Sequence, residues 1–164
     1  MSTAVTRAIK KRAKELKVDV VYSKKGHYNT AAGWSVVHYL LGIATAGTAG
    51  FVGVKNSSIK PSTVVVLSLT AAALGAIMTF LKPQEKATQH KLAGDDFDNL
   101  LQQICNFIEV ELLQGNDDDH TTRLTELVDK KTELNKASLP IPRLAYTRTR
   151  KGLQDGEASY TEKF

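Results

Sequence analysis

Two short stretches of the sequence carry side chains suited to binding a phosphate-bearing ligand. The first is "KKGHYN" at residues 24–29, which contributes Lys24, Lys25, His27 and Tyr28. Positive charge beside a ring that can stack on a base is typical of nucleotide-binding sites. Tyr28 and Trp34 could equally be aromatic anchors at a membrane–water interface, so both interpretations stay open here.

The second stretch is a basic run near the C-terminus, made up of Arg143, Arg148, Arg150 and Lys151. Guanidinium groups meet phosphate oxygens through two parallel hydrogen bonds, which makes arginine a preferred phosphate ligand. Between the basic ends, residues 84–136 hold 12 acidic and 6 basic side chains. We therefore predict that "KKGHYN" and the C-terminal basic run bind an anionic ligand, and that residues 10–17 contact anionic lipid headgroups. Docking of the basic ends on the acidic helices is the alternative.

The sequence does not contain a catalytic constellation. It has no glycine-rich phosphate loop, no nucleophile paired with a base, and no metal-ligand spacing, and its one cysteine is Cys105. "DDDH" at residues 117–120 is predicted to be an acidic turn between two helices. We expect a protein that is not an enzyme, holds no metal, and has no cofactor other than a regulatory nucleotide or oligonucleotide.

Two long uncharged runs must position these residues. Residues 31–54 and 62–81 contain no Asp, Glu, Lys or Arg, and each is long enough to cross a bilayer core of roughly 30 Å as a helix. The alternative is a buried helical hairpin in a soluble bundle, which rarely goes so long without a solvated charge. Lysines flank both runs, and the excess of positive charge outside them predicts an inner-membrane protein with both termini in the cytoplasm.

Small residues recur every four positions in both runs. They are Gly42, Ala46 and Gly50 in the first run and Ser68, Ala72 and Ala76 in the second. Such stripes allow membrane helices to approach closely. His38 and Thr45 are candidates to line a path, although His38 could instead be a neutral side chain bonded to a neighbouring helix. Two spans cannot enclose a path alone, so we predict a homo-oligomer, a tetramer, in the lipid bilayer.

The charged half that follows shows helical periodicity. Residues 84–114 place Phe97, Leu100, Leu101, Ile104, Ile108 and Leu112 on one face, and Pro83 is predicted to start this helix. A second helix, residues 121–137, places Leu124, Leu127, Val128, Lys131 and Leu134 on one side. The predicted fold is an all-α membrane protein, in which a two-span transmembrane hairpin continues into a cytoplasmic antiparallel helical pair. Its parts are a basic N-terminal segment (1–30), the hairpin (31–81), the helical domain (82–153) and a tail (154–164).

Several segments in this order resemble the SLATT domains, a family of bacterial two-span membrane effectors. The similar segments are "KGHYNTAAGWSVVHYLLG", "FLKPQEKATQHKLAGDDFDNLLQQI" and "LPIPRLAY". Pro83, Glu85, His90, Phe97 and Leu100 fall where the family pattern places such residues. The resemblance covers about residues 20–153 and depends on the order and spacing of the segments.

The resemblance implies a membrane-perturbing or pore-forming effector in anti-phage defence. It also implies control by a nucleotide-derived signal from a nucleotidyltransferase-type partner enzyme, with membrane depolarisation as the outcome. The family does not fix which residues bind the ligand, so the candidates remain those chosen from charge and position. The competing hypothesis is a membrane anchor or receptor that recruits a cytoplasmic partner without conducting ions.

Overall fold

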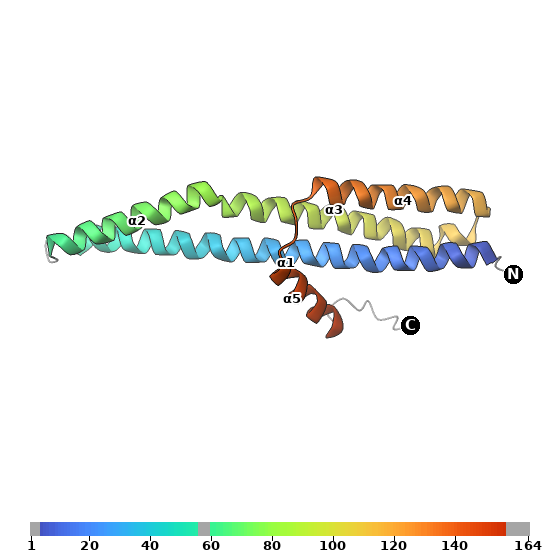
Figure 1. The fold of residues 1–164 in the computed structure, drawn as a ribbon, viewed down its shortest axis with the longest axis horizontal. Coiled ribbons are helices and arrows are strands. Elements are labelled where there is room, and N and C mark those ends of the chain that lie inside the picture. Colours follow the sequence, from blue (N-terminus) through green and yellow to red (C-terminus); the bar gives the residue numbers. More distant parts are fainter. Residues whose placement is uncertain (1–3, 56–59, 157–164) are drawn as a thin grey trace. The chain divides into compact units, whose positions relative to one another are not determined.

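A computed structural model describes residues 4–55 and 60–156, and within these ranges it contains helices and no strand. The helices, labelled in Figure 1, are α1 (Ala4–Lys55), α2 (Pro61–Leu81), α3 (Pro83–Glu109), the short 3₁₀ helix η2 (Glu111–Leu113), α4 (Asp117–Ala137) and α5 (Arg143–Gln154). Two helical stretches are long and apolar enough to cross a membrane. One lies within α1 and the other begins with α2. The coarse prediction of an all-α protein with two such helices is therefore confirmed.

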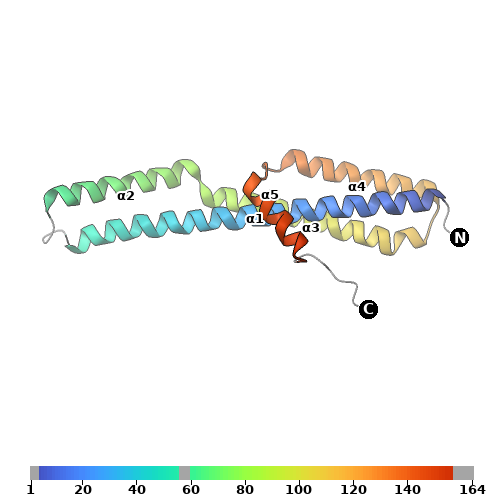
Figure 2. The same cartoon turned by 60° about the horizontal axis from the view of Figure 1, so that its bottom comes forward.

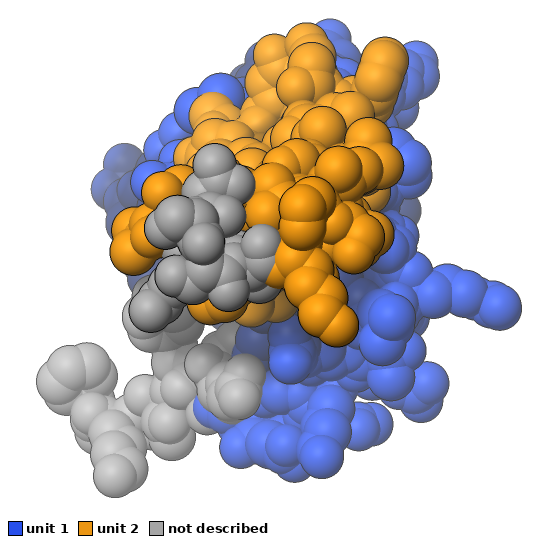
Figure 3. All heavy atoms as spheres, turned by 90° about the vertical axis from the view of Figure 1, so that its left-hand side faces the viewer, with its two compact units in different colours: residues 1–30, 89–164 blue, residues 31–88 orange. Residues whose placement is uncertain are grey.

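The chain forms two compact units, coloured separately in Figure 3. Unit 1 comprises residues 1–30 and 89–164, and unit 2 comprises residues 31–88. The helices α1 and α3 each contribute residues to both units.

Unit 1 has an apolar core between α1, α3 and α4. From α3 come Phe97, Leu100, Leu101, Ile104 and Phe107, and from α4 comes Leu127. Ile108, Leu112, Leu124, Val128 and Leu134 pack against this core. The apolar faces predicted for the two helices are therefore found, with Phe107 in addition. Burying each large side chain contributes roughly 1.5–3 kcal/mol, so this core favours the folded state of unit 1.

The N-terminal residues belong to this core as well. Ile9, Ala13, Leu16 and Val20 of α1 are buried in it, at steps of four, three and four residues. This spacing gives one apolar helical face. The prediction of a separate basic segment over residues 1–30 misses this face, because eight cations in the stretch obscure the four core positions.

Contacts between the helices set their directions. Thr6 Oγ1 of α1 donates to Asp117 Oδ1 of α4 at 2.7 Å, and Lys131 Nζ of α4 lies 2.9 Å from Asp19 Oδ2 of α1. The order of these contacts makes α1 and α4 parallel. Within unit 1, α3 runs antiparallel to both (Figures 1 and 2).

The acidic segment "DDDH" differs from its prediction. It forms the first turn of α4 and is not a turn between helices. Asn116 is the N-cap, and its side-chain oxygen accepts hydrogen bonds from the backbone N–H groups of Asp118 and Asp119. Carboxylates in a first turn are stabilised by the positive end of the helix dipole. The basic run 143–151 is likewise helical, because α5 begins at Arg143.

In unit 2, α2 lies beside the second part of α1 (Figures 1 and 2). No residue of the most apolar 18-residue window of either helix is buried. The half-buried positions of α1 include Trp34, His38, Leu41, Thr45, Thr48 and Val52, and those of α2 include Val64, Leu67, Ala71, Leu74, Met78 and Leu81. Alternating steps of three and four residues are the seam of a coiled-coil-like contact.

The small-residue stripes are not part of this seam. Ala46, Gly50, Ser68, Ala72 and Ala76 are exposed. A Cβ atom placed on Gly42 or on Gly50 would meet nothing within 4 Å. The stripes therefore do not pack against each other within one chain, and they leave flat surfaces open to lipid or to another copy.

The connection from α2 to α3 is a single residue, Lys82. It adopts the left-handed conformation (φ 46°, ψ 53°), and its N–H donates to the carbonyl of Met78. Pro83 then begins α3, as predicted. Proline is favoured at this position because the first helical residues have no intrahelical partner for an N–H group.

Candidate functional site

A cluster of polar side chains joins α1, α3 and α5 within unit 1. We call it the polar cluster. Its members are Lys24, His27, Tyr28 and Asn29 of α1, His90, Asp95 and Asp98 of α3, and Thr149 of α5. The α1 residues are those of the "KKGHYN" stretch, so the site singled out from sequence is in contact with residues up to 120 positions away.

Two histidines lie at the centre of the polar cluster. Their Nδ1 atoms are 3.0 Å apart, and the residues are only 2% (His27) and 3% (His90) exposed. A hydrogen bond between two ring nitrogens requires one N–H donor and one lone pair, so one Nδ1 carries a proton and the other does not. The His27 ring also stacks on Phe97, with centroids 5.4 Å apart.

The environment keeps both rings neutral. Burial, followed by the nearby His90 ring, lowers the pKa of His27 to about 4. Burial also lowers the pKa of His90. The two carboxylates of the cluster are already engaged, because Asp98 pairs with Lys24 at 2.7 Å and Asp95 accepts a hydrogen bond from Tyr28. Neither is bonded to an imidazolium.

Tyr28 is held by a hydrogen bond and by a close backbone contact. Its hydroxyl donates to Asp95 Oδ1 at 2.7 Å. A Cβ atom on Gly94 would lie 2.8 Å from Tyr28 Cε1, so the ring occupies the space that the glycine leaves. Burial and the hydrogen bond to Asp95 raise the pKa of Tyr28 to about 12. Tyr28 is therefore a neutral phenol with one ring face packed on α3.

The helix α5 and the segment before it contact α1 at the same level. Asn29 Nδ2 donates to Thr149 Oγ1 at 3.0 Å, and the rings of Tyr22 and Tyr146 stack with centroids 6.4 Å apart. A Cβ atom on Gly26 would lie 2.8 Å from Ile141 Cδ1. Two glycines, Gly26 and Gly94, thus allow close approach to α1 and α3 beside the histidine pair.

The candidate ligand residues fall into two sets. Lys24, His27 and Tyr28 are drawn together in the polar cluster with protein partners, and Lys25 is half-buried next to them. The other set, made up of Arg143, Arg148, Arg150 and Lys151, lies exposed on α5. Of the candidate ligand residues in the described part of unit 1, this second set is the one that is exposed to solvent.

In unit 2, His38 and Thr45 lie half-buried in the seam between α1 and α2. Thr45 Oγ1 donates to the backbone carbonyl of Leu41 at 2.8 Å, which satisfies its hydroxyl within the helix. The His38 ring meets Tyr39 edge-on with centroids 5.6 Å apart. These polar positions lie between the two helices of one chain, and the other candidates for helix packing lie outside the seam.

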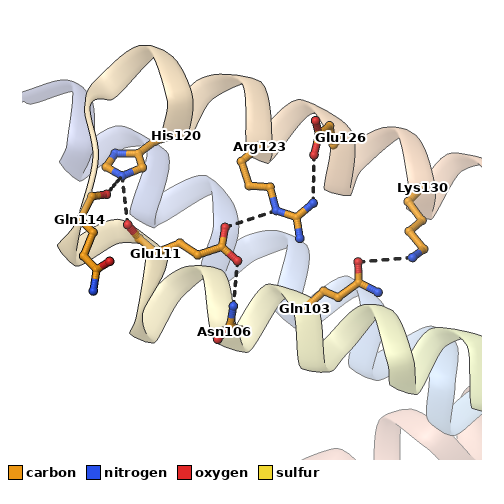
Figure 4. Close-up of polar contacts among 8 residues, drawn as sticks. All are labelled: Gln103, Asn106, Glu111, Gln114, His120, Arg123, Glu126 and Lys130. Carbon is orange, nitrogen blue, oxygen red and sulfur yellow. Dashed lines mark hydrogen bonds and ion pairs between the residues drawn. The ribbon is translucent and has the colours of Figure 1, made fainter.

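A second polar network ties η2 to α3 and α4 (Figure 4). His120 Nε2 donates to the backbone carbonyls of Glu111 and Gln114, at 3.1 and 2.6 Å. The Glu111 carboxylate accepts from Arg123 (3.3 Å) and from Asn106 (2.8 Å). Arg123 also pairs with Glu126 at 2.9 Å, and this bond, with the pairing to Glu111, raises its pKa. The network satisfies the carbonyl of Gln114 and adds a second hydrogen bond to that of Glu111, which also accepts from the Gln114 N–H.

Sequence reasoning did not identify His90, Asp95, Asp98 and Thr149 as partners of "KKGHYN". The sequence signal for these partners is their position along α3, because the polar residues of α3 meet those of α1 when the two helices run antiparallel. Among the residues that the structure describes, no group of three or more His, Cys, Asp or Glu side chains could hold a metal ion. No family model, no curated protein and no solved structure matches the chain.

Proposed function

We propose that the chain is an oligomeric membrane channel or pore-forming effector of the SLATT type, controlled from its helical unit by a nucleotide-derived ligand. The apolar surface of unit 2 supports the membrane part. Large side chains such as Ile43, Phe51, Leu69 and Phe80 are more than half exposed there. Contiguous exposed apolar surface of this kind requires a bilayer or a partner to cover it. The flanking lysines support an inner-membrane location with both termini in the cytoplasm.

The observation that carries the proposal is the continuity of α1. It is a single helix of 52 residues that supplies core residues to unit 1 and the first apolar run to unit 2. The second connection, between α2 and α3, has only Lys82 outside a helix. A helix resists bending because each turn is closed by backbone hydrogen bonds. A displacement of the helical unit therefore has little slack in which to be lost before it reaches the apolar helices.

The ligand in this proposal bears phosphate, and a nucleotidyltransferase-type partner enzyme supplies it. The exposed α5 residues Arg143, Arg148, Arg150 and Lys151 are its candidate contacts. α5 is held on α1 through Asn29–Thr149 and Tyr22–Tyr146, beside the histidine pair. A ligand that moves α5 would act on α1 at this point, and Lys24, His27 and Tyr28 would hold α1 against α3.

An ion-flux assay tests the proposal against the anchor hypothesis. Purified protein in liposomes loaded with KCl, read with a voltage-sensitive dye, should dissipate a potassium gradient, and protein-free liposomes should not. Membrane-inserted, assembled protein that leaves the gradient intact with and without a nucleotide extract from the host cell would favour an anchor or receptor. The variant Arg148→Glu/Arg150→Glu should remain assembled and lose its response to the extract. Lys91→Glu/Lys136→Glu, with the same change of charge, should keep it.

A further inference from the structure

The N-terminal part of α1 carries a second basic face that the polar cluster and α5 do not include. Arg7, Lys10, Lys11, Lys14, Glu15 and Val18 line one open hollow on the side of α1 opposite its core positions. Glu15 pairs with Arg12 at 3.2 Å. Within the described ranges, no ion pair engages Arg7, Lys10, Lys11 or Lys14. Like charges three and four residues apart on a helix repel each other, so the clustering of these four cations carries a cost.

The outer face of α4 is its electrostatic complement. Asp118 and Asp129 are exposed on the side of α4 opposite Leu127 and Leu134, Glu133 is exposed at the flank of this face, and Lys136 is its one basic residue. Over residues 4–55 and 60–156, none of the three has an ion-pair partner. Within the described residues, α1 thus presents a mainly basic face and α4 a mainly acidic face.

Parts of the two faces also lie at the same level along the parallel helix axes. Thr6 contacts Asp117 and Asp19 contacts Lys131, so parallel α1 and α4 are level at offsets of 111 and 112 residues. At these offsets Arg7 is level with Asp118. Lys14 is three or four residues, about 5 Å of helix rise, from the level of Asp129, which its long side chain can span. Copies related by rotation about an axis parallel to α1 keep these levels, so Arg7 and Lys14 of one copy can reach Asp118 and Asp129 of the next.

We propose that the basic α1 face (Arg7, Lys10, Lys11, Lys14) docks on the acidic α4 face (Asp118, Asp129, Glu133) of a second copy of this chain. The contact is head-to-tail, since it uses two different surfaces, and such contacts close into rings when the rotation closes. It rests on the proposed function only in taking the chain to be a homo-oligomer. It names the surfaces that hold the helical units together, independently of ion conduction.

Charge reversal tests the contact. Arg7→Glu/Lys14→Glu and Asp118→Lys/Asp129→Lys should each weaken assembly about tenfold at low salt, since each replaces exposed pairs by like charges. Light scattering in detergent measures the assembled mass, and circular dichroism checks that each variant is folded. Wild-type assembly should weaken as salt rises, because exposed charges are screened. Lys91→Glu/Lys130→Glu, which reverses two exposed lysines outside both faces, is the matched control and should assemble normally.

Mixing the two reversed variants gives the most specific result. The glutamates of one variant then face the lysines of the other, and the unchanged faces remain complementary. The mixture should assemble with alternating composition and an even number of copies, which native mass spectrometry resolves. Variants that assemble like the wild type alone, or a mixture that does not recover, would overturn the proposal. If Arg7→Glu/Lys14→Glu instead elutes earlier from heparin while its assembled mass is unchanged, the α1 face binds an anionic polymer and not another copy.

The proposed contact and the proposed channel can fail independently of each other. A wild-type ring that passes these tests and conducts no ions contradicts the proposed channel and leaves the contact standing. Ion flux that persists while charge reversal leaves the assembled mass unchanged contradicts the contact alone.

Discussion

His27 of α1 and His90 of α3 face each other through their Nδ1 atoms at 3.0 Å in the buried part of unit 1. Because one ring must donate and the other accept, this contact exists only while at most one of the two rings is protonated. The pair thus links the packing of α1 on α3 to the protonation state of two residues that are 63 positions apart in the sequence.

The stability of unit 1 should fall in mild acid because of this pair. The pKa of His27 in the fold is about 4, below its ordinary value of 6.5, so the folded state favours the neutral ring. Its contribution is complete above pH 6.5 and is lost as the pH falls from 6.5 toward 4, by an amount on the order of 3 kcal/mol. Denaturant unfolding followed by circular dichroism at several pH values measures this. In His27→Leu/His90→Leu the decline should be much smaller, and an unchanged decline would assign it to the carboxylates.

Replacing both histidines should lower the free energy of unfolding by less than the sum of the two single replacements. His90→Leu leaves Nδ1 of His27 buried without a partner, which costs about 1–3 kcal/mol. His27→Leu/His90→Leu leaves no orphaned nitrogen, so its free energy of unfolding should be higher than the sum of the single effects predicts. Equilibrium unfolding of the four proteins in this cycle gives the coupling. Strict additivity would mean that the two rings do not interact.

Adding a side chain at Gly94 should destabilise unit 1. The Cβ of Gly94→Ala would lie 2.8 Å from the Tyr28 ring, which must then move and give up its bond to Asp95. We expect a loss of about 1–3 kcal/mol of stability. Gly33→Ala is the control, because its Cβ meets nothing within 4 Å, and alanine in a helix should raise stability slightly. If Gly94→Ala is as stable as Gly33→Ala, the close contact between Tyr28 and α3 does not exist in solution.

Lys82 should be replaceable by glycine with a gain in stability. A non-glycine residue in the left-handed conformation costs roughly 1–2 kcal/mol, and glycine has no such penalty. Lys82→Gly should raise the midpoint of thermal unfolding in detergent by about 2–4 °C. Lys91→Gly, an exposed position inside α3, should lower it by a similar amount. A lower midpoint for Lys82→Gly would show that Lys82 is helical and that α2 continues into α3.

The sequence allowed the apolar faces of α3 and α4 to be predicted, because Phe97, Leu100 and Ile104 recur at helical spacing in a region of mixed charge. The core face of the first 20 residues was overlooked although Ile9, Ala13, Leu16 and Val20 show the same spacing. Periodicity is harder to see where cations outnumber apolar residues. "DDDH" was assigned to a turn because three acidic residues suggest solvent, whereas the N-cap Asn116 and the helix dipole favour them in a first turn.

The polar cluster could be predicted from the sequence only in part. Charge and ring type drew attention to Lys24, His27 and Tyr28, but their partners depend on the pairing of α1 with α3 across more than 60 residues. Sequence spacing within one helix cannot supply that pairing. It also cannot show whether a lysine is offered to a ligand or, like Lys24, is already paired with a carboxylate.

Coupling through α1 is the central claim, and a cycle of ion-flux measurements tests it most directly. Ala32→Pro removes a backbone hydrogen bond of α1 and breaks or kinks the helix there, whereas Ala32→Leu keeps it. The change Arg148→Glu/Arg150→Glu is then made in both backgrounds, and potassium flux is read in liposomes with the host-cell nucleotide extract. The account predicts that charge reversal on α5 changes the flux in the Ala32→Leu protein and has no effect in the Ala32→Pro protein. An equal effect in both backgrounds, or none in either, would contradict it.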